Sequence, residues 1–179
     1  IGTSGIYIKG QTEGFSTYYG DPNDGGWGWQ GTLGHMKPGY MYMLQMDSNA
    51  ELVYPSNAAA SYNPGSLFEQ TLPEFDFRQY EFNGSITAQI DIEDIIVGKN
   101  DKLTAYIGSE VRGEVSPMLF APTNEYVFPL MAYSNDLEEQ MTFSFYDSKT
   151  GSIYEEIANL TFTNDMIIGS AMEALDITF

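Results

Sequence analysis

The sequence contains no cysteine and only one histidine among its 179 residues. Without thiols, a cysteine nucleophile is excluded and an ordinary zinc site is excluded in practice. His35 lies in GTLGHMKPG, a predicted turn, and no G-x-S-x-G nucleophile elbow accompanies it. Lys37 and Lys99 lack the glycine-rich context of a phosphate-binding loop. The sequence therefore predicts a protein that is not an enzyme.

Basic residues are also scarce. The chain has 7 Lys and Arg against 25 Asp and Glu, a formal charge of −18. Such a charge repels phosphate backbones and anionic lipids, so we expect no binding to nucleic acid. No apolar run approaches the roughly 20 residues of a membrane span, so we expect no membrane insertion. The chain opens on Ile1 without a signal peptide, which predicts a processed segment of a longer protein.

What the sequence has in abundance is typical of β-proteins. Hydrophobic residues make up 42% of the chain and aromatic residues 15%. Short alternating stretches are separated by turns at intervals of about ten residues, and no helical periodicity is present. The pattern predicts an all-β protein, an antiparallel β-sandwich with two closely packed halves. We expect an N-terminal β-subdomain at 1–54, a connection at 55–74 and a C-terminal sandwich at 75–179.

The clearest strand pattern runs from residue 80 to residue 113. Asn83-Gly84 predicts a type I′ turn, because both central residues of that turn need positive φ angles. After it, apolar side chains at alternate positions predict a strand with one buried face. Further on, Glu110, Arg112 and Glu114 alternate in the same way, which predicts one shared strand face. This pattern has three interpretations: an ion-pair ladder on the strand, an Arg112 that pairs with a carboxylate on a neighbouring strand, or an Arg112 that binds a ligand.

Four aromatic residues suggest a binding surface. Trp27 and Trp29 lie two positions apart, so in a strand both rings face the same side, and Tyr40 and Tyr42 follow a nearby turn. Together they predict a stacking platform for sugar rings, whereas the alternative reading places them in the core.

Carboxylates suggest a cation site. Asp91, Glu93, Asp94 and Asp101 supply oxygen ligands beside a predicted loop, which suits Ca²⁺. The loop 21–26 partly imitates a calcium loop as well. The alternatives are a solvated acidic face and a plain turn.

Two asparagines begin formal glycosylation sequons, Asn83-Gly84-Ser85 and Asn159-Leu160-Thr161. A chain of this composition contains about as many such triplets by chance, so the sequons only indicate candidate sites.

One motif resembles a poorly characterised β-domain of secreted and cell-surface multidomain proteins from Bacteroidetes-like bacteria and aquatic microbes. The motif combines an aspartate, alternating apolar residues and a G-x-E-x-R-G ending, carried here by Asp101, Leu103, Ala105, Tyr106, Ile107, Gly108, Glu110, Arg112 and Gly113. The resemblance implies an extracellular or cell-surface location and a role in display or attachment.

Three functions follow as expectations. The first is a non-catalytic structural or adhesive module of a larger surface or filament-forming protein. Its partners would be other copies of itself or neighbouring domains, with a terminal strand, Ile6–Lys9 or Leu175–Phe179, near a contact. The alternatives are a carbohydrate-binding module and an accessory domain of a secreted hydrolase. No cofactor is expected apart from Ca²⁺.

Overall fold

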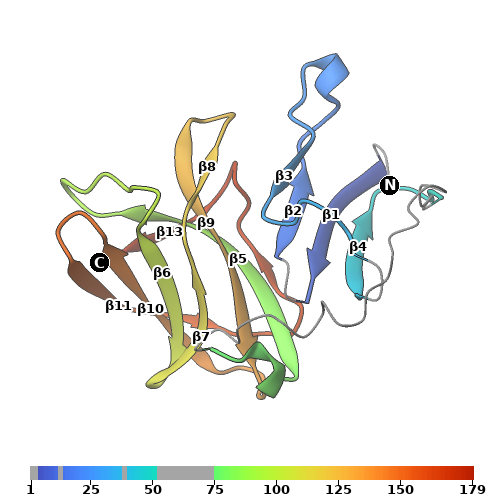
Figure 1. Cartoon of the computed structure of the whole chain (residues 1–179). Helices are drawn as coiled ribbons and strands as arrows, with labels where there is room; N and C mark the ends of the chain where they lie inside the picture. The colour runs from blue at the N-terminus through green and yellow to red at the C-terminus, as the bar shows by residue number, and fades with distance from the viewer. Residues whose placement is uncertain (1–3, 12–13, 38–39, 52–74) are drawn as a thin grey trace. The chain divides into compact units, whose positions relative to one another are not determined.

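The computed structural model describes residues 4–11, 14–37, 40–51 and 75–179, and for residues 156–159 it describes the main chain only. The chain divides into two compact units, residues 1–76 and 77–179. The prediction of an all-β protein is confirmed, because helix in the described residues is limited to short 3-10 turns (Figure 1). None of these helices could cross a membrane. The connection predicted at 55–74 lies outside the described residues.

The N-terminal unit is built on one antiparallel sheet with the strand order β3-β2-β1-β4. Its strands are β1 (Gly5–Gly10), β2 (Phe15–Tyr18), β3 (Trp29–Gly31) and β4 (Tyr42–Met46). Strand β1 pairs with β2 on one side and with β4 on the other. Strand β1, which contains Ile6–Lys9, is therefore central in its sheet, and a contact of this strand with a partner stays a prediction.

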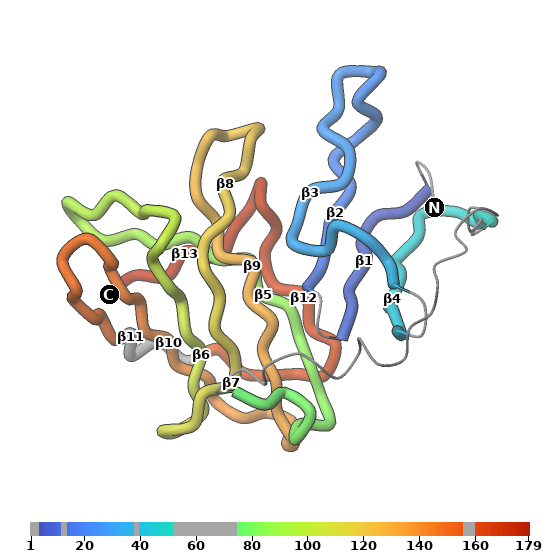
Figure 2. Tube along the Cα trace, viewed as in Figure 1, coloured from blue at the N-terminus to red at the C-terminus, as the bar shows by residue number. Residues whose placement is uncertain are grey.

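The C-terminal unit contains two sheets. Their strands are β5 (Phe82–Asp91), β6 (Lys102–Ile107), β7 (Glu110–Val115), β8 (Met118–Phe120), β9 (Glu125–Ser134), β10 (Gln140–Asp147), β11 (Ser152–Thr161), β12 (Ile167–Ile168) and β13 (Leu175–Thr178). One sheet has the order β11-β10-β6-β7, and the other has the order β12-β5-β9-β8, with β13 also paired to β5. Figure 2 follows the chain through both sheets.

The core of this unit lies between the two sheets. Period-2 alternation sends every second side chain of each strand inward, so both sheets contribute apolar residues. These are Ile86, Ala88, Leu103, Ala105, Phe128, Leu130, Ala132, Met141, Phe143, Phe145, Phe162, Met166 and Ile177.

Strand β5 corrects one turn prediction. Asn83-Gly84 is part of a continuous ten-residue strand, in which Asn83 pairs with Tyr133 of β9. Gly84 serves packing rather than a turn, because a side chain there would collide with Met166. Two parallel strands, β12 and β13, line the other side of β5. The missing side chain at Gly84 thus makes room for Met166, although the Asn83-Gly84 dipeptide alone predicts a reversal of the chain.

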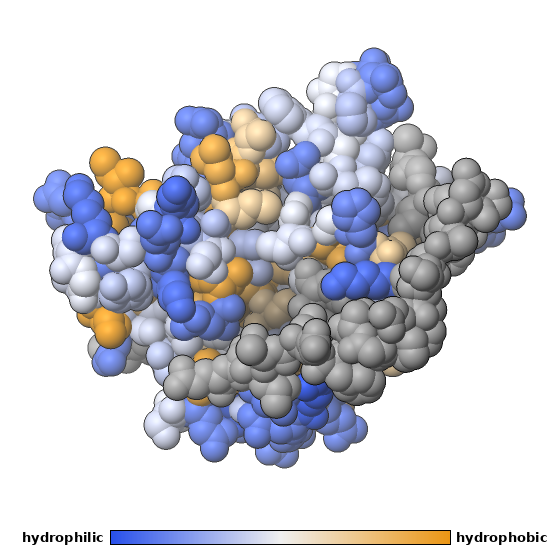
Figure 3. Space-filling view, in the orientation of Figure 1, coloured by the Kyte–Doolittle hydropathy of each residue, from blue (hydrophilic) through white to orange (hydrophobic). Residues whose placement is uncertain are grey.

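The surface shows scattered apolar residues. Figure 3 shows orange patches among the blue and pale residues of the C-terminal unit. The large apolar side chains that are exposed include Ile96, Leu119, Leu137, Tyr146, Ile153, Ile167 and Met172 in this unit. Single exposed apolar residues are ordinary, so only those that occur together on one element indicate an interaction surface.

Candidate functional site

The residues of the G-x-E-x-R-G motif first explain how the sandwich is built. Leu103 and Ala105 are fully buried in the core. Gly108 has φ +60° in the turn between β6 and β7, a conformation that favours glycine. Gly113 lies against the main-chain carbonyl of Met131, where a side chain would collide. Much of the motif therefore encodes strand packing and a tight turn.

A β-bulge separates the three charged residues of β7. The register runs Thr104↔Glu114 and Ala105↔Gly113, then shifts before Tyr106, so Arg112 has no direct partner in β6. Glu114 forms a half-exposed ion pair with Lys102 at 2.7 Å, and this hydrogen bond raises the pKa of Lys102. The prediction of one shared face for Glu110, Arg112 and Glu114 is wrong, because the bulge adds a residue to the alternation.

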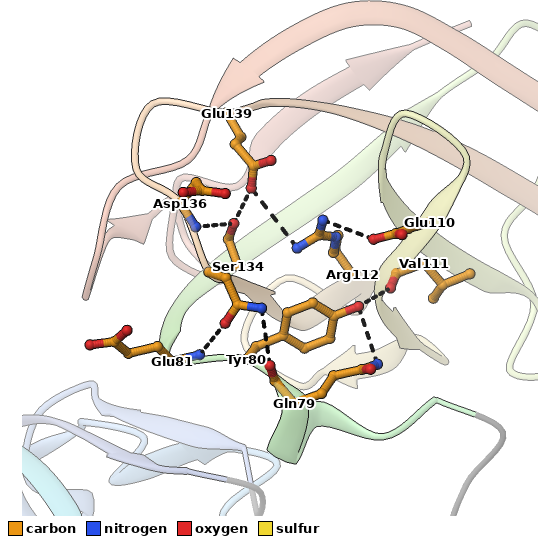
Figure 4. Close-up of polar contacts among 10 residues, drawn as sticks. Gln79, Tyr80, Glu81, Glu110, Val111, Arg112, Ser134, Asp136 and Glu139 are labelled. Carbon is orange, nitrogen blue, oxygen red and sulfur yellow. Dashed lines mark hydrogen bonds and ion pairs between the residues drawn. The ribbon is translucent and has the colours of Figure 1, made fainter.

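Arg112 is a buried member of a polar cluster (Figure 4). Its Nη2 donates a hydrogen bond to Glu110 Oε2 at 3.0 Å, and its Nη1 lies 3.9 Å from Glu139 Oε2. The guanidinium lies over the Tyr80 ring, 4.7 Å from the centroid, in a cation–π contact. Its side chain is only 9% exposed, and neither Nε nor Nη1 has a hydrogen-bond acceptor among the described residues.

The cluster joins three segments of the C-terminal unit. Ser134 Oγ donates to Glu139 and accepts a hydrogen bond from the Asp136 main-chain N–H at 3.2 Å. Asn135 Nδ2 donates to the Gln79 carbonyl at 3.0 Å. Because the Nε and Nη1 atoms of the arginine are buried, solvent does not reach them in this structure. The arrangement favours a structural arginine over a ligand-binding one.

The edge strand β11 carries the more accessible feature. Among the described residues it pairs only with β10, which leaves its outer edge unpaired. Ile153 and Tyr146 are cross-strand neighbours, and 65% of Ile153 and 38% of Tyr146 remain exposed. Lys102 flanks Tyr146 on the other side through the β6 register. An unpaired edge bordered by exposed apolar side chains can accept an additional strand.

The hairpin that links β2 to β3 forms a second surface feature. Beyond the paired strands it continues as an arm, residues 19–28, held by main-chain hydrogen bonds from Tyr19 N to Gly28 O and from Trp27 N to Tyr19 O, both 2.8 Å. The tip is the 3-10 turn η2 (Pro22–Asp24), whose N-cap Asp21 accepts a hydrogen bond from Asn23 N. Trp27 is 50% exposed on this arm.

The structure separates the four aromatic residues of the predicted sugar platform. Trp29 opens β3 and Tyr42 opens β4, and these strands form opposite edges of the sheet. With three strand spacings of about 4.8 Å between them, they are roughly 14 Å apart. Tyr42 instead accepts a hydrogen bond from Lys37 N, and Lys37 Nζ lies over Tyr40. Trp27 and Trp29 share the arm and its base, whereas the two tyrosines lie near β4.

The structure also places the predicted calcium residues. Asp101 is buried and accepts hydrogen bonds from Gly98 N, Ser148 N and Ser148 Oγ. The other three, Asp91, Glu93 and Asp94, are exposed at the end of β5 and just beyond it. In the described ranges no group of three or more acidic or histidine side chains is placed to share one metal ion. Calcium binding stays a prediction.

The two sequons lie in different surroundings. Asn83 is the second residue of β5 and pairs with β9, and its Oδ1 is buried without a hydrogen-bond partner among the described residues. The side chain of Asn159 is outside the described residues. Glycosylation at both positions stays a prediction.

Comparison of the chain with family models, curated proteins and solved structures gives no match.

The sequence reasoning missed Ile153 and Tyr146 as an exposed apolar surface. A signal was present, because Phe143 and Phe145 fix the inward positions of β10 and leave Tyr146 facing outward. It also missed Tyr18, whose ring meets that of Trp29 at a centroid distance of 5.4 Å.

Proposed function

We propose that this chain is a non-catalytic structural or adhesive module that acts through protein–protein contacts, and that the edge of β11 receives an extended strand from a partner. The observation that carries this proposal is the exposed Ile153–Tyr146 pair beside an edge that is unpaired among the described residues. An added strand gains main-chain hydrogen bonds and sends alternate side chains to the outer face, where their aliphatic parts cover Ile153.

Charge defines the kind of partner. The C-terminal unit has five Lys and Arg against 17 Asp and Glu, a formal charge of 5 − 17 = −12. Glu155 is exposed on the same strand as Ile153. Ile153 and Glu155 lie two positions apart in β11 and so share the outer face. A partner strand that alternates apolar and basic residues can place its basic side chains on this face, with their aliphatic stems on Ile153 and their charges beside Glu155. A second copy of this chain instead brings another −18. The proposed partner is therefore a basic extended segment of a neighbouring domain or of another protein.

The location belongs to the proposal as well. An extracellular or cell-surface setting is supported by the resemblance of the G-x-E-x-R-G motif to domains of secreted proteins. A module that displays or attaches other domains needs a stable core and an accessible edge. The fully buried core of the sandwich and the outer edge of β11 supply these two properties.

Peptide binding tests the proposal. The probes are a capped peptide of alternating valine and lysine and its counterpart of alternating valine and glutamate, measured by fluorescence anisotropy. We expect only the basic peptide to bind, and Ile153→Lys to weaken it by about tenfold or more. Leu137→Lys is the matched control, since Leu137 is 54% exposed in the turn at the other end of β10.

The control separates strand addition from general attraction. If both lysine variants weaken binding equally, the peptide recognises only the negative charge and the edge proposal fails. Amide hydrogen exchange gives a second criterion, because an added strand protects main-chain N–H groups of residues 152–156. Sedimentation that shows a dimer lost in Ile153→Lys would assign the edge to a second copy and overturn the basic partner.

A further inference from the structure

The arm between β2 and β3 presents an aromatic surface that protein–protein contacts at β11 do not use. Trp27 is half exposed on the arm, and Trp29 and Tyr18 form a ring pair at its base. We propose that Trp27, Trp29 and Tyr18 form a binding site for a neutral carbohydrate. This site lies in the N-terminal unit and is independent of the contact proposed at β11.

The arm holds Trp27 in a fixed position. The main-chain N–H of Trp27 donates to the Tyr19 carbonyl at 2.8 Å, and its carbonyl accepts a hydrogen bond from Gln30 Nε2 at 2.7 Å. Gly26 packs so closely against Gly20 that a side chain there would collide with the main chain. A residue whose main chain is already ordered loses less conformational entropy on binding, which favours even a weak ligand.

The ring pair of Tyr18 and Trp29 adds aromatic surface at the base of the arm. Tyr18 and Trp29 are cross-strand partners at the last pair of β2 and β3. Their rings are tilted by 48°, and neither side chain is fully buried. Trp27 lies only two residues from Trp29, so aromatic side chains occur both at the base of the arm and on the arm itself. A short row of rings suits a chain of sugar units better than a single sugar.

Polar groups around the rings define the ligand class. Sugar rings offer an apolar C–H face, which stacks on aromatic rings, and hydroxyl groups, which donate to carboxylates. Asp24 is exposed at the tip of the arm, and Asp21 is close enough to act on Tyr18. Desolvation, with a smaller effect from the charge of Asp21, raises the pKa of the Tyr18 phenol. These two carboxylates accept hydroxyl hydrogen bonds and repel acidic saccharides.

Intrinsic fluorescence tests the site directly, because Trp27 and Trp29 are the only two tryptophans of the chain. The whole chain is titrated with the neutral hexasaccharides of cellulose, mannan, xylan and galactan, and with oligogalacturonate as the acidic comparator. We expect at least one neutral hexasaccharide to shift or quench the emission below roughly 10 mM. Oligogalacturonate should have no effect at low salt.

Variants identify the residues involved. Trp27→Ala should weaken binding by about tenfold or more, measured by calorimetry because it removes a fluorophore, and Trp27→Phe should restore part of it. Met41→Ala is the control, since Met41 is 80% exposed in the same unit but outside the arm. Ile153→Lys should leave saccharide binding unchanged, which keeps this test separate from that of the β11 edge.

Three results would contradict the proposal. One is the absence of any fluorescence response to all four neutral hexasaccharides at about 10 mM, a concentration that detects affinities in the millimolar range. Another is binding that Trp27→Ala and Met41→Ala affect equally. Stronger binding of the acidic comparator than of every neutral saccharide would also contradict the assigned ligand class.

Discussion

At the scale of single residues, Gly113 has the least room for a side chain among the described glycines of the sandwich. It belongs to β7, and a Cβ atom there would overlap the main-chain carbonyl oxygen of Met131 in β9. The backbones of two strands from different sheets thus approach each other closely at this position. Main-chain atoms cannot move aside as the end of a flexible side chain can, so only glycine fits.

Gly113→Ala should therefore destabilise the protein by about 3 kcal/mol or more, through overpacking. Gly108→Ala is the matched control, since nothing lies within 4 Å of its added Cβ. Its positive φ should cost only about 1–2 kcal/mol. Urea denaturation followed by circular dichroism measures both, and equal losses would contradict the close approach at Gly113.

Arg112 gives a second prediction at this scale. An unmade hydrogen bond of a buried donor costs about 1–3 kcal/mol, and two of its donors have no acceptor among the described residues. The bond to the largely exposed Glu110 and the contact with Tyr80 offset this cost. Arg112→Met keeps the packing and should change the free energy of unfolding by only about 1 kcal/mol.

Arg112→Ala removes the packing on Tyr80 as well and should cost about 2–4 kcal/mol. Chemical denaturation of both variants separates the two contributions. A loss above about 3 kcal/mol in Arg112→Met would show that the guanidinium itself stabilises the fold.

Asp147 predicts a pH dependence. Its carboxylate accepts hydrogen bonds from Thr150 Oγ1 at 2.7 Å and from Lys149 N at 2.8 Å, which lower its pKa in the folded state. The resulting stabilisation is present at neutral pH. It is lost as the pH falls below about 4, which is the pKa of aspartate in the unfolded chain, and then through the lower pKa of Asp147 in the folded state.

Thr150→Val should therefore lower the Tm most at pH 7, and the difference should shrink toward pH 2–3. A remainder persists at low pH, because Thr150 Oγ1 also accepts a hydrogen bond from Ser152 N. Melting curves of both proteins between pH 2 and 7 measure the effect. A difference that does not vary with pH would show that the Asp147 charge is not involved.

At the scale of elements, Asp101 ties the loop after β5 to the hairpin between β10 and β11. It accepts three hydrogen bonds, from Gly98 N and from two groups of Ser148. Asp101→Asn turns one acceptor oxygen into a donor and should cost about 2–4 kcal/mol. Melting in millimolar Ca²⁺ and in EDTA extends the test. A Tm raised by Ca²⁺ only when Asp101 is present would assign the ion to this loop.

The elements also show what could be predicted from the sequence. Strict alternation of apolar and polar residues predicts most strands of the sandwich, for example β10 with Met141, Phe143 and Phe145 on one face. Local rules failed where a distant segment decides the conformation. Asn83-Gly84 favours a turn by itself, yet β9 and Met166 hold it extended. The bulge at Arg112 leaves no clear sequence signal, because the residue types around it are those of an ordinary strand.

The candidate sites were predicted less well than the fold. The sequence indicated Trp27 and Trp29 as an aromatic pair. It could not show that Tyr42 lies far from them, because the distance of β3 from β4 depends on the strand order, which periodicity does not encode. Tyr18 joins Trp29 through cross-strand register for the same reason. Exposure of Ile153 depends on the place of β11 at an edge, which is again a matter of topology.

At the scale of the whole molecule, the C-terminal unit contains a complete core of its own. Every residue of the main apolar cluster falls within 77–179. A fragment of residues 77–179 should therefore fold alone and unfold in a single cooperative transition. Calorimetry and near-ultraviolet circular dichroism measure this. A fragment with strand content but without a cooperative transition would show that its core needs residues 1–76.

The pairing of β13 with β5 also governs when this unit can form during synthesis. Leu175 pairs with Ala88, and Ile177 is almost fully buried in the core, so the last strand completes the surroundings of the first one. A ribosome delivers β5 long before β13, and the sandwich stays incomplete until β13 emerges. Long-range pairing of this kind slows folding. The nascent unit thus carries an open β5 edge through most of its translation, the stage at which chaperone protection matters most.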